Sequence, residues 1–275
     1  MNKYFFGIFI VSVALLGFTN VSADHAWGNY HWARIANPFA LKLGDNVTGT
    51  WDSYLRTAST KWSLSSVLDT SVVTGLSNRV NCRPRAGRVE VCNYTYGQNG
   101  WLGIAQIWIS GSHITQGVAK MNDTYFNTAT YNKPAWKRLV VCQEVAHAFG
   151  LDHQDEVFNN ENLGTCMDYT NDPDGGVGGA SATDPSNEYP NQHDYDMLEE
   201  IYAHLDATTT LAAATSGKGF GALFEKFLES RSEWGKAVQK DGKGRHNLFV
   251  RDFGKGNKVV THIFWAEETQ QGEEH

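Results

Sequence analysis

The sequence has few prolines, few cysteines and no surplus of basic residues. Its 275 residues include six prolines and four cysteines, and 41% are hydrophobic. This composition excludes fibrous, collagen-like and wholly disordered chains, and the length suffices for a large hydrophobic core. Lys and Arg number 23 against 30 Asp and Glu, which gives a net charge of −7. Phosphate binding needs clustered basic residues in excess, so we expect no nucleic-acid partner.

Long apolar runs are also missing, except for one at the N-terminus. Lys3 precedes an apolar run over residues 4–18, and Val21-Ser22-Ala23 fits a small-x-small cleavage site. We therefore predict a signal peptide over residues 1–23 and a secreted, extracellular or periplasmic protein. An uncleaved membrane anchor is the alternative, but the run is short for a membrane span. After signal removal, no other stretch could cross a bilayer, so we expect no membrane association.

Export makes disulfides possible for the four cysteines, Cys82, Cys92, Cys142 and Cys166. Four cysteines allow three pairings. We expect the two nearest-neighbour pairs, Cys82 with Cys92 and Cys142 with Cys166. Neither pair has the close C-x-x-C spacing of a structural zinc site.

Charge is distributed unevenly along the mature chain. Acidic residues outnumber basic ones over 24–215, whereas basic residues outnumber acidic ones over 216–266. A stretch rich in Thr, Ala, Ser and Gly separates the two parts and is typical of a linker. We predict a catalytic domain over 24–206, a linker over 207–219, a small β-rich region over 220–266 and an acidic tail over 267–275.

Hydrophobic periodicity predicts alternating strands and helices in the first part. We expect strands over 31–36, 71–76, 101–109 and 114–121, and helices over 51–62, 134–149 and from Asp194 onward. In the second part, the same periodicity predicts strands over 234–238, 247–253 and 258–266. The fold class is therefore α+β, with a mixed sheet, a few large helices and a small C-terminal β-rich appendage. The basic appendage either packs against the acidic part or binds an acidic polymer.

The most informative stretch is Gln143-Glu144-Val145-Ala146-His147-Ala148-Phe149-Gly150-Leu151-Asp152-His153. On a helix, residues 143 and 147 share one face. Gly150 permits the positive φ that ends a helix, so His153 can return to the same place. Two imidazoles, one further ligand and a position left for water are the design of a catalytic zinc site.

This stretch resembles the metzincin clan of zinc endopeptidases, whose motif is H-E-x-x-H-x-x-G-x-x-H followed by a Met-turn. Cys166-Met167-Asp168-Tyr169 is similar to that Met-turn. The resemblance implies a twisted mixed sheet with three main helices. It also implies that Gln143, His147 and His153 bind Zn²⁺ or another divalent metal, that Glu144 is the general base, and that Tyr169 stabilises the oxyanion. Among the supporting residues, it implies Gly150 at the turn, Met167 below the metal, and Asp194 as a helix N-cap that supports the Met-turn.

Residue 143 departs from the motif because it is glutamine and not histidine. A carboxamide is a weaker zinc ligand than neutral imidazole, although gametolysin-like metzincins include members with glutamine there. Two interpretations follow. The first is a secreted, monomeric zinc metalloendopeptidase that hydrolyses peptide or protein substrates. The second is a noncatalytic metzincin-like protein that binds peptides or surfaces.

Two further expectations concern residues outside the motif. A substrate peptide would add a strand to an exposed sheet edge, and residues 114–122 are the candidate edge. The remaining histidines sit in no ligand pattern, so we expect surface or packing roles for them; they include His25, His31, His113, His204, His246, His262 and His275.

Overall fold

A computed structural model describes residues 25–176, 182–211 and 226–267. The predicted signal peptide, most of the predicted linker, His275 and the tail beyond residue 267 lie outside these described residues. Within the described ranges, no helix is both long and apolar enough to span a membrane.

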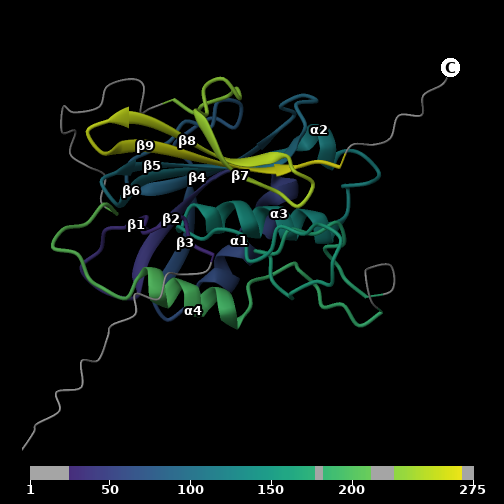
Figure 1. Ribbon diagram of the computed structural model, residues 1–275, viewed down its shortest axis with the longest axis horizontal. Coiled ribbons are helices and arrows are strands. Elements are labelled where there is room, and N and C mark those ends of the chain that lie inside the picture. Colours follow the sequence, from purple (N-terminus) through teal and green to yellow (C-terminus); the bar gives the residue numbers. More distant parts are fainter. Residues whose placement is uncertain (1–24, 177–181, 212–225, 268–275) are drawn as a thin grey trace, which may run out of the picture.

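The structure is built on one large mixed sheet (Figure 1). The strands are β1 His31–Trp32, β2 Phe39–Asn46, β3 Leu68–Thr74, β4 Arg88–Tyr94, β5 Trp101–Ser110, β6 His113–Asn122, β7 Lys236–Lys240, β8 His246–Gly254 and β9 Asn257–Trp265. Their order is β3-β2-β4-β6-β5-β9-β8-β7, and β1 pairs with β6. The strands from β3 to β6 are parallel, whereas those from β6 to β7 run antiparallel to their neighbours.

The three longer helices lie below strands β8 and β9 in Figure 1. The helices are α1 Gly49–Trp62, α2 Asp123–Phe126, α3 Pro134–His147 and α4 Gln192–Ile201. Helix α1 buries Trp51, Leu55, Ala58 and Trp62, which follow each other at helical spacing. Helix α3 begins with Pro134, a residue suited to the first turn of a helix, and it contacts both α1 and the sheet. The predicted α+β class with a mixed sheet and a few helices is confirmed.

Two parallel strands were not predicted from the sequence. The expected strand over 31–36 is only the two-residue β1, and the longer β2 follows it. Strand β4 is buried along nearly its whole length but carries Arg88 and Glu90. These two side chains form an ion pair at 2.7 Å inside the protein. Their charges interrupt the apolar pattern that would otherwise indicate a buried strand.

The candidate substrate edge over residues 114–122 was wrong. Strand β6 lies between β4 and β5 and pairs with both of them. Its residues from Val118 to Asn122 are all buried. Because its backbone groups are already paired on both sides, β6 cannot accept an added peptide strand.

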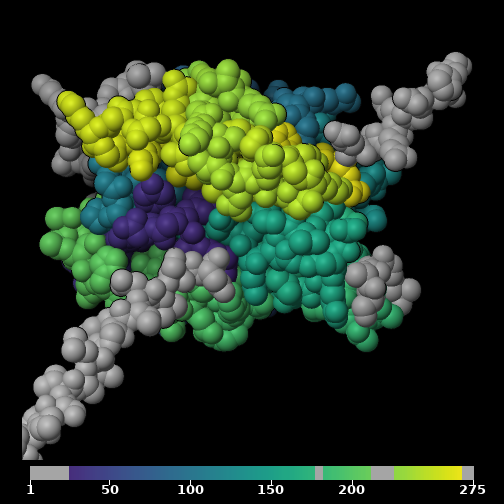
Figure 2. Space-filling view, viewed as in Figure 1, coloured from purple at the N-terminus to yellow at the C-terminus, as the bar shows by residue number. Residues whose placement is uncertain are grey.

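The predicted C-terminal strands are present, and they continue the main sheet. Strand β9 pairs antiparallel with β5, and β8 and β7 follow outward from it. Figure 2 shows this segment, yellow-green to yellow, as a continuous layer lying directly on teal residues from the middle of the sequence. The C-terminal strands therefore occupy the side of β5 that would otherwise be a sheet edge.

Both expected disulfides are present. Cys82 is bonded to Cys92 and Cys142 to Cys166, and no free cysteine occurs among the described residues. The second bond joins α3 to the segment that contains Met167. It therefore links the motif helix covalently to the predicted Met-turn.

Candidate metal centre

Helix α3 carries the first half of the motif into the interior. Gln143, Glu144 and His147 are all fully buried on its last turns. Polar side chains in such a place normally require partners, because losing water without a replacement hydrogen bond costs free energy. Within the described part of the chain, neither carboxamide atom of Gln143 and neither carboxylate oxygen of Glu144 has a hydrogen-bond partner.

Gly150 turns the chain directly after α3. Its φ is +106°, a left-handed conformation that residues with a side chain rarely adopt. A Cβ at this position would also lie 2.4 Å from the carbonyl oxygen of Tyr30. Only glycine fits both conditions, and the turn allows His153 to reach the face of His147. The two rings lie 4.9 Å apart, measured between centroids.

Each of these histidines has one ring nitrogen fixed by a hydrogen bond. His147 Nδ1 donates to the carbonyl oxygen of Leu151 at 2.8 Å, and His153 Nδ1 donates to Glu156 Oε1 at 2.9 Å. Both acceptors require a proton on Nδ1, so in the neutral ring Nε2 keeps its lone pair. Neither Nε2 atom has a hydrogen-bond partner among the described residues. Metal-binding histidines are held in this way.

We expected a surface or packing role for His262, and the structure places it beside the two motif histidines. Strand β9 carries it to the motif, where its ring centroid lies 3.7 Å from that of His147 and 4.3 Å from that of His153. One ring nitrogen from each of the three histidines lies within 4.8 Å of the others, so the group could hold a metal ion. The donor set suits zinc, which is bound by imidazole nitrogen and often by three protein ligands.

Burial governs the protonation of the cluster. It lowers the pKa of His147 and of His262 well below the ordinary value, and the other histidines of the cluster lower both further. For His153, burial also lowers the pKa, but the nearby Glu156 carboxylate raises it above the ordinary value. Burial raises the pKa of Glu144 well above its ordinary value. These shifts favour the neutral forms of His147 and His262, which are the forms that bind metal.

A close approach between α3 and the sheet brings Glu144 against strand β5. A Cβ on Gly103 would lie 2.3 Å from Glu144 Oε1 and 2.7 Å from Val140 Cγ1. Glycine at this position therefore makes room for the glutamate side chain between helix and strand.

The predicted Met-turn segment, residues 166–169, is held by a short chain of hydrogen bonds. The N–H of Met167 donates to Thr165 Oγ1 at 3.0 Å, and the Thr165 hydroxyl donates to Asp194. The prediction that Asp194 caps α4 was wrong, since the N-cap is Asn191 and Asp194 is the third helical residue of a capping box. Asp194 nevertheless contacts the Met-turn segment from this position.

Tyr169 is fully buried beside His153, with ring centroids 5.1 Å apart. Its hydroxyl accepts hydrogen bonds from the backbone N–H of Trp265 at 3.0 Å and from Arg245 Nη2 at 3.4 Å. Burial raises the pKa of Tyr169 above its ordinary value, so the hydroxyl stays protonated at neutral pH.

Glu156 connects the histidine cluster to the C-terminal strands. Besides His153, its carboxylate accepts hydrogen bonds from Gln239 Nε2 at 2.6 Å and from Asn247 Nδ2 at 2.9 Å. These two residues belong to β7 and β8. The orientation of one motif histidine thus depends on side chains about 90 residues further along the sequence.

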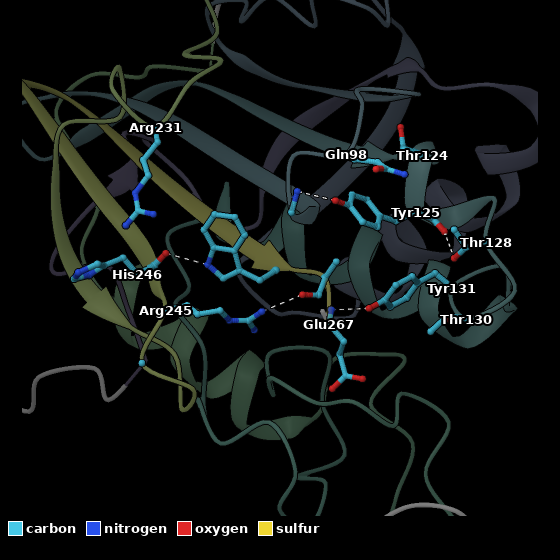
Figure 3. A pocket seen from close by; sticks show the side chains of 14 residues that line it. Gln98, Thr124, Tyr125, Thr128, Thr130, Tyr131, Arg231, Arg245, His246 and Glu267 are labelled. Carbon is cyan, nitrogen blue, oxygen red and sulfur yellow. Dashed lines mark hydrogen bonds between the residues drawn. The ribbon is translucent and has the colours of Figure 1, made fainter. Parts of the chain in front are cut away.

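A cavity of about 780 Å³ lies between the start of β8, the end of β9 and the chain after α2 (Figure 3). Arg231, Arg245 and His246 line one side, and Tyr125 and Tyr131 line the other. None of the three clustered histidines lines it. Two of its lining residues, Arg245 and Trp265, instead contact the Tyr169 hydroxyl.

Three further histidines lie around one carboxylate. His31, His113 and His204 surround Asp206, with ring nitrogens 3.1–3.6 Å from its Oδ1. Asp206 also accepts a hydrogen bond from Arg34 at 3.2 Å. This group connects β1 and β6 to the chain that follows α4.

Comparisons with known proteins give only distant similarities. No family model and no curated protein matches the sequence. Among solved structures, high choriolytic enzyme 1, a hatching enzyme zinc-protease from Oryzias latipes (Medaka fish), is 10% identical, covering 63% of this chain and 94% of that chain with a TM-score of 0.33. Myroilysin is 13% identical, covering 62% of this chain and 96% of that chain with a TM-score of 0.33.

Proposed function

We propose that this protein is a secreted zinc metalloendopeptidase of metzincin type. One observation carries the proposal. The Nε2 atoms of His147 and His153 are buried without hydrogen-bond partners in the described chain, while hydrogen bonds fix the opposite ring nitrogens. A pair of imidazoles held in this way fits a bound metal ion. Glu144 lies three residues before His147 on the same helix, where a general base is needed.

His147 and His153 would hold the zinc, and the motif assigns a third position to Gln143. When bound, zinc polarises a carbonyl group and lowers the pKa of a coordinated water to about 7. Glu144 would accept a proton from the attacking water and later transfer it to the leaving amine. The Tyr169 hydroxyl, which is protonated, would donate a hydrogen bond to the developing oxyanion, a contribution of about 3 kcal/mol.

The proposal is tested by zinc content and casein hydrolysis. We expect about one zinc per chain and measurable cleavage that a chelator abolishes. Glu144→Gln should keep the zinc but lower kcat by about 100- to 10,000-fold, because the general base is lost. Glu161→Gln, at an exposed position, is the matched control and should leave cleavage unchanged. Equal turnover in wild type and Glu144→Gln would refute this role of Glu144.

The burial of the site favours a second function, a noncatalytic metzincin-like protein that binds metal. Glu144, His147 and Tyr169 have no exposed surface, and strand β5 is paired on both sides, by β6 and β9. A substrate strand therefore finds no free edge on β5. Bound zinc without casein cleavage, in wild type and in Gln143→His alike, would favour this function. Cleavage gained by Gln143→His would instead indicate a weakened enzyme.

A further inference from the structure

The first position of the zinc motif is occupied by a poor ligand. Gln143 offers a carboxamide oxygen, which suits hard cations better than zinc. His147 on the same helix and His153 after the turn nevertheless have Nε2 atoms without a hydrogen-bond partner in the described ranges. A zinc site with only two imidazoles would be weak, so a tight site needs another nitrogen ligand near the pair.

His262 is that nitrogen donor. Its side chain is fully buried, and across the described residues neither Nδ1 nor Nε2 has a hydrogen-bond partner. A neutral imidazole has one N–H donor and one nitrogen lone pair, and water hydrogen-bonds to both. Burying the ring without replacing these hydrogen bonds therefore costs free energy of folding. The ring faces His147 and His153 at 3.7 and 4.3 Å between centroids. A metal ion shared by the three rings removes the cost.

The position of His262 is set by the sheet and not by a loop. On β9 it pairs with Ala105 of β5 on one side and with Leu248 of β8 on the other. Its neighbours on the same face, Val260 and Phe264, belong to the core cluster that includes α3. A ligand on a central strand is held rigidly, which reduces the entropy lost on metal binding.

Other contacts fix β9 and its neighbours to the same site. The N–H of Trp265 bonds to the Tyr169 hydroxyl at 3.0 Å, and Asn247 bonds to Glu156, which orients His153. The C-terminal strands thus contact the residues around the histidine pair at several places. This arrangement explains how a residue far outside the motif can complete it.

Ring stacking alone would be the other reason to bury an imidazole here. Trp27 stacks on His147 at 5.1 Å and lies 6.0 Å from His262, both between ring centroids. A phenylalanine would satisfy this packing equally well and would leave no unpaired nitrogens. The distinction between a ligand and a packed ring is therefore experimental, and His262→Phe separates the two.

We propose that His262 is the third protein ligand of the metal ion, in place of Gln143, so that metal binding fastens the C-terminal strands to helix α3. The inference rests on the proposed zinc centre but does not require peptidase activity. It makes the region after residue 226 a part of the site and not a separate module.

The test measures zinc affinity by competition with a chelator, using the full mature chain and zinc alone. His262→Phe should weaken zinc binding by at least about 100-fold, since even residues that only support ligands contribute 10- to 100-fold. Gln143→Ala should change it by less than about threefold. His246→Phe, on neighbouring β8, is the matched control and should bind zinc as the wild type does. Loss of zinc in Gln143→Ala with full affinity in His262→Phe would overturn the proposal.

Wild-type protein provides a second measurement that needs no variant. Zinc-edge X-ray absorption should count three imidazoles, whereas two imidazoles would overturn the assignment. Hydrogen exchange in β9 should slow on zinc addition, because a ligand that binds only the folded state stabilises it. Zinc held through His262 without casein cleavage would leave this inference standing while the proposed peptidase activity fails. Casein cleavage together with a zinc affinity that does not depend on His262 would support the peptidase activity and refute this inference.

Discussion

The hydroxyl of Tyr169 accepts a hydrogen bond from the backbone N–H of Trp265 at 3.0 Å. This contact joins the Met-turn segment to strand β9 across almost 100 residues of sequence. A residue that the metzincin resemblance assigns to catalysis thus also supports the attachment of the C-terminal strands.

Tyr169→Phe should therefore lower stability whatever its effect on catalysis. The substitution removes the acceptor for the Trp265 N–H, and an unpaired buried donor costs about 1–3 kcal/mol. Denaturant unfolding of both proteins measures the difference. Tyr54→Phe is the control, because the Tyr54 side chain is only partly buried on α1. Equal unfolding midpoints for Tyr169→Phe and wild type would contradict the prediction.

Gly103→Ala should disturb the metal centre through Glu144. The added methyl group would lie 2.3 Å from Glu144 Oε1 and 2.7 Å from Val140 Cγ1, so helix α3 and strand β5 must separate. We expect a loss of stability of about 1–3 kcal/mol and weaker zinc binding. Gly117→Ala is a milder control, since its Cβ would lie 3.1 Å from Ala148 Cβ. Similar zinc affinity and stability for both variants would show that the contact with Glu144 does not matter.

Replacing both Cys142 and Cys166 by serine should reduce stability and zinc affinity together. Opening a loop with a separation of 24 residues costs about 3 kcal/mol in the chain-entropy model. This bond also ties α3 to the segment of Met167, so its loss loosens the histidine pair. The matching double serine variant of Cys82 and Cys92 should lose stability but keep its zinc affinity. An equal drop in zinc affinity in both variants would indicate a general effect of unfolding.

Because of Lys120, we expect the stability of the folded protein to rise with pH in the alkaline range. Its side chain is fully buried, with Nζ 3.2 Å from Glu229 and 3.8 Å from the ring centroid of Phe227. Burial lowers its pKa from 10.5 to about 8. Between these values the unfolded chain binds more protons than the folded one, so stability from this group rises with pH, by at most about 1.4 kcal/mol per pH unit.

Urea unfolding at pH 8 and pH 9.5 checks this dependence. Wild type should gain stability over this range. Lys120→Met, which keeps a long side chain against the same ring, should lose that gain. If the stability of the wild type does not change over this range, or if it falls equally in wild type and variant, Lys120 does not titrate as expected.

Several features were predictable from local sequence. Helix α3 and its Gly150 turn follow from spacing and backbone sterics, and the two nearest-neighbour disulfides were among only three possible pairings. Strand β4 was not predictable, because its Arg88 and Glu90 neutralise each other only once they are folded into the sheet. The hydrophobic pattern of a sequence does not show that two charged residues will form an ion pair in the protein interior.

The sequence by itself determined the zinc-type motif of Glu144, His147 and His153, because these residues lie close together on one helix and the turn that follows. Only the tertiary structure decided the surroundings of that motif. Strand β9 reaches His147 by pairing with β5, a contact between residues more than 150 positions apart in the sequence. Such pairing depends on the register of the whole sheet, so no local pattern in the sequence could have brought His262 to the site.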